Sequence, residues 1–262
     1  MICEDIKIGG TVTTGGITGG TSVSNYGLMV ADYSNLWGTV AKRASIERTI
    51  GQAGGVITGQ ELPDARIQTL SLRATDMTST GGGKTAQQLW DNQDTLTSLF
   101  TATGGAVIEW ILPTESRWIR AYALNSAGMQ TFGKYRTLAI PLTSPWPYWQ
   151  SDTQESQVVN GAGVSIAALG GTVQRVYNPT IVFSADGTFT DVTSGLAITV
   201  TGSAAPVTVS RDSVTGRWSA VESGASVPGK ISVNDSRWMF LTVGGTFTST
   251  VSCTVYWRDQ WE

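Results

Sequence analysis

The second part of the chain, after Gln150, alternates between apolar and polar residues with a period of two. Leu196, Ile198 and Val200 are separated by alanine and threonine, and the same alternation runs through 251–257. Successive side chains of a strand point to opposite faces, so this pattern predicts half-buried β-strands. Further short strands are predicted at 180–184, 207–210, 216–220 and 238–243. Many short strands at regular spacing predict an antiparallel sandwich or jelly roll.

The first part of the chain has one helical segment. Apolar residues of Thr85–Phe100 recur at helical spacing, and Thr85 followed by Gln88 matches a capping box. The opposite, polar face is predicted to carry Asp91, Asn92 and Asp94. One face of this helix is therefore expected to pack on a sheet.

Strands account for the rest of the first part. They are predicted at 27–33, 36–41, 44–50, 66–74, 106–112, 117–125 and 132–142. Within the 117–125 strand, Trp118, Arg120 and Tyr122 share one face. Large amphipathic side chains beside a charge suit a protein interface, and packing on the helix is the alternative.

A proline-rich aromatic stretch separates the two parts. Pro145 and Pro147 lack an amide donor and push the preceding residues out of the helical region, so the backbone here is expected to be extended and stiff. Trp146, Tyr148 and Trp149 provide large surfaces for packing. The stretch from Pro145 to Trp149 is predicted to be a rigid junction between a domain of residues 1–150 and a domain of residues 151–262.

Two glycine-rich segments have no decided structure. The glycine pairs of Ile6–Thr21 are compatible with a hairpin and with an arm that a partner orders. Gly51–Gln60 is weakly patterned, which predicts a functional or unstructured loop.

Composition excludes several classes of function. The sequence has no histidine, which removes the Ser-His-Asp and Cys-His catalytic sets and the usual zinc and iron ligand sets. Basic and acidic residues balance up to Gln150, acidic residues exceed basic ones after it, and no basic run exists, so tight binding of nucleic acid by charge is not expected. Two cysteines and no long apolar run indicate a chain without a disulfide framework or membrane span, folded in a reducing cytoplasm.

Three motifs that could carry chemistry have simpler explanations. Gly81–Thr85, GGGKT, lacks the first glycine of a phosphate loop because Thr78 stands at that position, and it is interpreted as a turn before the helix. The pair Asp91 and Asp94 is interpreted as solvated charge. The spacing of Glu109 and Glu115 across a cleft, which a glycosidase would require, cannot be read from sequence.

Aromatic stacking on a sandwich suggests carbohydrate binding, although packing is the favoured explanation for these tryptophans. The candidates are Trp218, Trp238, Trp257 and Trp261. Cys253 alternates with polar neighbours and is predicted to be a buried, unreactive thiol.

The order of these segments resembles the distal tail proteins of long-tailed, non-contractile phages, particularly those of actinobacterial hosts. The resemblance covers most of the chain. It rests on the Ile67–Leu72 strand, the helix, AVIEWIL, RWIRAYAL, QTFGKYRTLAIPL running into SPWPYW, YNPTIVFS, TVSRD and VYWRDQW.

That resemblance implies a mainly β fold. Its first domain would be barrel-like with one flanking helix, and its second a galectin-like antiparallel sandwich. Six copies of the first domain would close a ring at the distal end of the tail, and the sandwich would lie outside. The glycine-rich segments would then be ordered by neighbouring subunits. Sugar-binding galectins use a histidine that this chain lacks, so the sandwich need not bind sugar as they do.

The same resemblance implies a structural virion protein without catalytic residues, cofactor or metal, assembled in the host cytoplasm. Its partners would be its own copies, the tail-tube protein above, the tail-tip hub or tail-associated protein below, and the tape-measure protein. DNA would pass through the lumen without specific binding, and the chain would not insert into a membrane. A host-surface carbohydrate-binding module or adhesin, and a tail-tube subunit, are the alternative functions.

Overall fold

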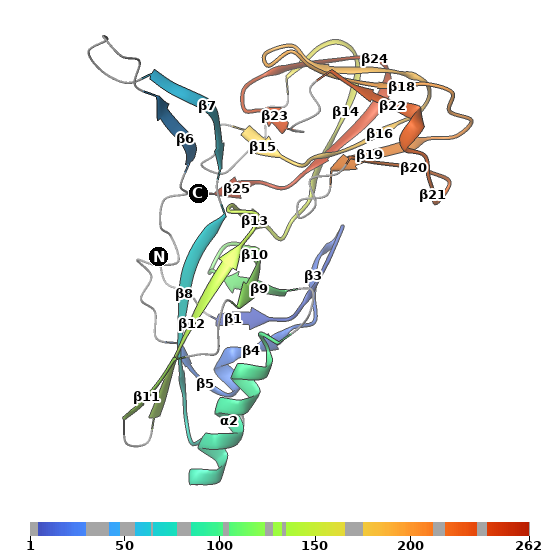
Figure 1. The fold of residues 1–262 in the computed structure, drawn as a ribbon. Helices are drawn as coiled ribbons and strands as arrows, with labels where there is room; N and C mark the ends of the chain where they lie inside the picture. Colours follow the sequence, from blue (N-terminus) through green and yellow to red (C-terminus); the bar gives the residue numbers. More distant parts are fainter. Residues whose placement is uncertain are drawn as a thin grey trace. The chain divides into compact units, whose positions relative to one another are not determined.

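The computed structural model describes residues 5–29, 42–47, 56–63, 65–77, 85–101, 105–123, 128–132, 135–165, 175–211, 218–234 and 240–261. The chain divides into two compact units. The first holds Met1–Thr13 and Ile17–Trp149, and the second holds Thr14–Gly16 and Gln150–Trp261. Strands dominate the described residues, and α2 is their one α-helix, so the mainly β fold class is confirmed (Figure 1).

The first unit is built on one antiparallel sheet with the order β4-β1-β9-β10-β12-β8-β5. β11 pairs with β12, while β2 with β3 and β6 with β7 form separate two-stranded sheets. The strands are β1 (Asp5–Ile8), β2 (Thr11–Thr13), β3 (Gly16–Thr18), β4 (Thr21–Ser22), β5 (Gly27–Met29), β6 (Lys42–Glu47), β7 (Val56–Pro63), β8 (Arg66–Ala74), β9 (Ala106–Ile111), β10 (Ser116–Ala123), β11 (Gly128–Phe132) and β12 (Tyr135–Ser144).

This sheet curls because its two ends are joined by a short connection. Only the 3-10 turn η1 (Val23–Asn25) and Tyr26 separate β4 from β5, and four residues span at most about 14 Å. Asp5 on β1 holds the connection in place, since its carboxylate accepts hydrogen bonds from the hydroxyls of Ser22 and Ser24. The result is the barrel-like first domain expected from the resemblance.

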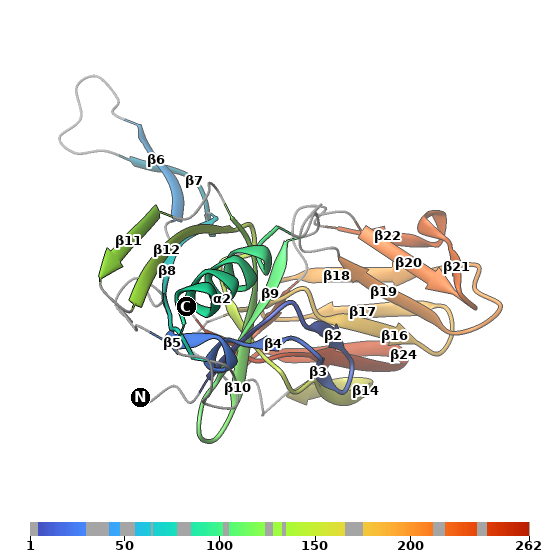
Figure 2. The same cartoon turned by 90° about the horizontal axis from the view of Figure 1, so that it is seen from below.

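Helix α2 (Ala86–Ser98) packs on β8 and β12 (Figure 2). Leu89, Leu96 and Phe100 are its buried apolar contacts. They face the same core as the alternating side chains of β8, where Leu70 and Leu72 are buried as predicted. The sheet therefore has an inner face covered in part by α2 and an outer face opposite to it.

The structure corrects three predictions in the first unit. Residues 56–60 of the predicted Gly51–Gln60 loop belong to strand β7, because they pair with β6. The predicted strand 132–142 is the end of one strand and most of the next, with Phe132 opposite Tyr135 in the β11–β12 hairpin. The glycine-rich segment 6–21 forms β-structure with a β2–β3 hairpin, which decides between its two alternatives. The predicted strand 36–41 lies outside the described residues.

The second unit is a set of antiparallel strands arranged around the long strand β24. Its elements are β13 (Trp149–Ser151), which begins at the unit boundary, β14 (Glu155–Ser165), β15 (Arg175–Tyr177), β16 (Thr180–Phe183), β17 (Gly187–Asp191), β18 (Leu196–Val200), β19 (Val207–Arg211), β20 (Trp218–Glu222), β21 (Ala225–Ser226), η2 (Pro228–Lys230), β22 (Ile231–Val233), β23 (Phe240–Thr242), β24 (Thr246–Trp257) and β25 (Gln260–Trp261). β14 follows one edge of β24, while β15 pairs with β23 and β13 with β25.

The opposite edge of β24 is shared by two strands placed end to end. β16 pairs with its C-terminal half and β17 with its N-terminal half, and 184–186 interrupt the ladder between them. The next layer is interrupted in the same way, because β18 pairs with β17, β19 pairs with β16, and 201–206 lie between. We call this line of interruptions the corner. On both sides of it the inward side chains are buried apolar residues, including Ile181, Phe183, Val207, Val209, Phe189, Ile198 and Phe247.

Gly187 marks the point where the corner and β24 approach most closely. A Cβ atom at this position would lie 2.6 Å from Val251 Cγ2 and 2.8 Å from Thr250 Oγ1. Both neighbours are β-branched and stiff, and Thr250 Oγ1 already accepts a 2.8 Å hydrogen bond from the amide of Thr188. A side chain at Gly187 would therefore displace the β17–β24 pairing.

We expect Gly187→Ala to lower the free energy of unfolding by about 1–3 kcal/mol, the cost of overpacking a tight site. Urea unfolding followed by circular dichroism measures the change. The matched control is Gly229→Ala, because no atom lies within 4 Å of the Cβ position there. Equal midpoints for the two variants would contradict this explanation of Gly187.

Candidate functional site

The predicted junction residues are mostly buried. Pro145 is exposed, whereas Trp146, Pro147, Tyr148 and Trp149 are buried, Trp149 completely. The ring of Trp149 packs edge-on against Trp110 of β9, with centroids 5.8 Å apart, and Trp146 packs edge-on against Tyr148 at 5.5 Å. The end of the first unit is therefore anchored by aromatic side chains.

The chain is anchored again immediately after the junction. Arg258, near the C-terminus, donates from Nη1 to the carbonyl oxygens of Ser151 and Asp152, and the amide of Ser151 donates to the carbonyl of Asp259 at 2.9 Å. Burial lowers the pKa of Arg258, and the nearby Asp152 opposes that shift. Only Gln150 separates the buried Trp149 from this second anchor. Sequence reasoning missed Arg258, because no local pattern links residue 258 to residue 151.

The outward side of α2 includes an ordered aromatic–cation pair. The guanidinium carbon of Arg136, on β12, lies 3.1 Å from the ring centroid of Trp90, and its Nη1 donates to Gln93 Oε1 at 2.7 Å. Arg136 is buried, while Trp90 remains 45 % exposed. Such stacking holds a large aromatic side chain in one position at the surface.

Two expectations for α2 are wrong in detail. Asn92 was predicted on the polar face, but it is buried because its amide donates to the carbonyl oxygens of Thr75 and Met77 at 2.8 and 2.7 Å. The capping box forms only in part. Thr85 Oγ1 accepts from the amide of Gln88, whereas the Gln88 side chain donates to Asn92 instead of returning to the cap.

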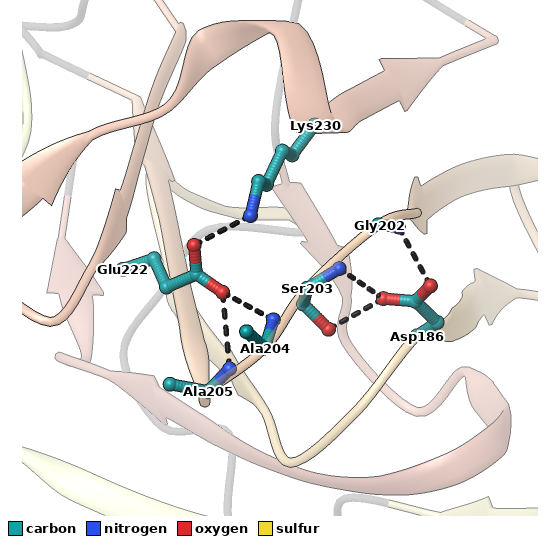
Figure 3. A network of polar contacts seen from close by, with 7 residues as sticks. All are labelled: Asp186, Gly202, Ser203, Ala204, Ala205, Glu222 and Lys230. Carbon is teal, nitrogen blue, oxygen red and sulfur yellow. Dashed lines mark hydrogen bonds and ion pairs between the residues drawn. The ribbon is translucent and has the colours of Figure 1, made fainter.

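The corner of the second unit carries the densest polar network on its surface (Figure 3). Asp186 accepts from the amides of Gly202 and Ser203 at 2.6 and 2.7 Å and from the Ser203 hydroxyl. Glu222 accepts from the amides of Ala204 and Ala205 at 2.6 and 3.0 Å. Two carboxylates thus bind four successive backbone N–H groups that the interrupted ladder leaves without strand partners.

Lys230 completes this network. Its Nζ lies 2.6 Å from Glu222 Oε2, and its carbonyl accepts from the amide of Thr201. Hydrogen bonds to Ser203 and Gly202 lower the pKa of Asp186, and the Lys230 hydrogen bond followed by those of Ala204 and Ala205 lowers the pKa of Glu222. Both groups are held ionised, so the network fixes a loop and is not arranged for proton transfer.

A second carboxylate joins two turns of this unit. Asp191 is completely buried and accepts from the amides of Thr193 and Ser194 and from both the amide and hydroxyl of Thr242. The turns that follow β17 and β23 are therefore held together through one side chain.

The other predicted candidates do not form a reactive site. Asp91 and Asp94 are exposed, and Glu115 pairs with Arg117. In the described part of the chain, no group of three or more potential ligand side chains could hold a metal ion, and no helix is long and apolar enough to cross a membrane. Thr85 is the helix cap, and 81–84 of the GGGKT motif lie outside the described residues.

The structure also places the tryptophans and the cysteine. Trp257 is 4 % exposed, so it cannot offer a stacking surface to a sugar, while Trp218 and Trp261 are half-buried. Trp238 lies outside the described residues. Cys253 is buried as predicted, and burial raises the pKa of its thiol.

Comparison with solved structures finds the same fold over the whole chain. The SPP1 Dit protein, described as a paradigm of the hub adsorption apparatus in phages that infect Gram-positive bacteria, aligns with a TM-score of 0.68, at 16 % identity, over 98 % of this chain and 99 % of that chain. The chain has the fold of a phage hub protein. A chain of the phage P2 baseplate in its activated conformation aligns with a TM-score of 0.52, at 11 % identity, over 99 % of this chain and 98 % of that chain. No family model and no curated protein matches the sequence.

We expect Trp149→Ala to lower the free energy of unfolding of the first unit by about 3–5 kcal/mol, because a large buried ring leaves a cavity. Thermal or urea unfolding followed by far-UV circular dichroism measures the loss. Pro145→Ala, at the exposed end of the same stretch, should cost less than about 1 kcal/mol. A small effect at Trp149 would show that the junction is not anchored through this side chain.

The corner network should make stability depend on acid. Folding lowers the pKa of Asp186 and Glu222 below their ordinary values of 3.8 and 4.5, so their contribution is complete above those values and is lost as pH falls through the folded-state pKa values. We expect Asp186→Asn to lower the melting temperature at neutral pH and to flatten its decrease below about pH 4.5. Glu155→Gln, an exposed strand residue, is the control for the lost charge. Parallel melting curves for wild type and Asp186→Asn across that range would refute the role of the network.

Proposed function

We propose that the chain is a structural virion protein that forms a homohexameric ring at the distal end of a phage tail, between the tail tube and the host-recognition tip. The observation that carries this proposal is the similarity to a phage hub protein over nearly the full length of both chains. A match that covers both compact units supports the same overall plan better than a match to one unit would.

The first unit supplies the features that a ring subunit requires. Its sheet is curled and closed by a short connection, and its inner face is covered in part by α2. The second unit has its own core around β24, so it can be carried by a ring without taking part in closing it. The anchors on both sides of Gln150 would transmit load between ring and sandwich, as the rigid-junction prediction requires.

The charge of the first part suits a channel through which DNA passes. Basic and acidic residues balance up to Gln150, and a basic lumen would instead bind phosphates and slow passage of the genome. In this proposal DNA is cargo and is not bound specifically. The protein partners would be the tail-tube protein, the tail-tip hub or tail-associated protein and the tape-measure protein.

The proposal gives the chain no catalytic residue, cofactor or metal. The carboxylates with a lowered pKa, Asp186 and Glu222, are occupied by backbone amides and a lysine, which leaves them no free position for a substrate. The chain would be assembled in the host cytoplasm and would reside in the tail of the virion.

Electron microscopy of the purified full-length chain, with its mass measured on the same sample, tests this function. We expect closed six-fold rings with knobs at the periphery. Long open filaments would instead indicate a tail-tube subunit. A chain that never forms rings, even with its tail partners present, together with measurable binding in a glycan screen, would favour a carbohydrate-binding module and refute the ring.

A further inference from the structure

One side of α2 carries exposed side chains that the helix does not need for its own packing. Residues 87, 91, 94 and 98 follow the helical spacing along the side opposite to Leu89 and Leu96, and all four are exposed. Trp90 borders this side and is held by Arg136. We call Trp90, Asp91 and Asp94 the helix stripe; it is apolar at one position and acidic at two.

A different group of exposed side chains lies on the outer face of the sheet. Ile67 is 74 % exposed, Thr143 is opposite it on β12, and Tyr122 is opposite Thr143 on β10. Directly opposed residues of antiparallel strands share a face, so Ile67 and Tyr122 lie on the same side of the sheet. Arg120 is two residues from Tyr122 and therefore shares that side, where it is half-buried. We call Ile67, Tyr122 and Arg120 the sheet patch.

The position of Tyr122 is fixed by a glycine. A Cβ atom on Gly105 would lie 2.9 Å from the Tyr122 ring, so the ring occupies the space that any other residue would fill. Gly105 also has a φ of +73°, which disfavours other residues. The sheet patch thus contains a preorganised aromatic side chain, as the helix stripe does.

The two surfaces lie on opposite sides of one layered unit. α2 packs on β8 and β12 through the inner face, where Arg136 contacts Trp90, whereas Ile67 alternates with the inward residues of β8. The helix stripe and the sheet patch therefore cannot meet within one subunit. Two different complementary surfaces on opposite sides are what a head-to-tail ring contact requires.

We propose that the helix stripe of one subunit docks on the sheet patch of the next copy of this chain. The inference rests on the proposed ring and names its subunit contact. The stripe has two carboxylates and the patch has a guanidinium, while Trp90 is matched by Ile67 and Tyr122, so the surfaces complement each other in charge and in apolar character. Rigid Trp and Tyr side chains are the residues that contribute most at such contacts.

A charge exchange tests this contact in the full-length chain. The variants are Asp91→Lys with Asp94→Lys, Arg120→Glu alone, and all three substitutions together. Sedimentation velocity over a concentration series measures self-association, and circular dichroism reports folding. We expect the helix variant and the Arg120→Glu variant each to associate at least about tenfold more weakly than wild type, and the combined variant to recover most of that loss, because the two charges are exchanged.

Glu155→Lys is the matched control, since it makes the same kind of charge change on an exposed strand of the second unit and should leave association unchanged. Wild-type rings together with undiminished rings in the helix variant would overturn this contact and leave the proposed ring intact. The helix variant changes only exposed side chains, so it keeps the test valid even where Arg120→Glu prevents folding. A wild-type chain that stays monomeric at every concentration would also overturn the contact, and the ring would then be judged from the chain in the presence of its tail partners.

Discussion

The structure depends on finding a partner for every backbone amide where a strand ladder stops. A chain built mostly of short strands has many such places, and water cannot reach all of them. In this protein side chains take over the pairing. Asp5 closes the curled sheet, Asp186 and Glu222 bind the amides of the corner, and Asp191 joins two turns.

Gln260 shows the same solution in its simplest form. Its side-chain amide accepts from the amide of Tyr177 and donates to the carbonyl of the same residue, at 3.1 and 2.9 Å, so it acts as one more residue of a strand. Carboxylates and amides that would be candidates for chemistry in an enzyme are used here as structural acceptors. This use explains why a chain with several ordered acidic groups nevertheless supports a structural role.

The first unit has an architecture that separates its surfaces. The inner face of the curled sheet is consumed by the core and by α2, and what remains exposed lies on two opposite sides. Apolar and charged side chains on these sides differ in character, which suits repeated contacts between identical copies without self-pairing of one surface. The second unit, with its own core, places no such demand on the first.

Sequence patterns were reliable where burial has a strict period. The alternation of β8 and β18 was visible in the residues because a half-buried strand leaves a period-two trace, and the spacing of Leu89 and Leu96 likewise located α2. Predictions failed where one distant contact decides. Asn92 looked like a solvated residue until its amide met two carbonyls 15 and 17 residues away, and β7 looked like a loop because its strand character comes from pairing with β6.

The sequence by itself determined the mainly β class, the single helical segment in the described chain, the buried Cys253 and the resemblance to distal tail proteins. Each follows from local periodicity or from the order of segments, which the chain carries in any conformation. Only the tertiary structure decided how the sheet closes, which carboxylates bind the corner, and that Arg258 secures the residues after the junction. These depend on groups far apart in sequence that meet only after the chain has folded, so no local pattern encodes them.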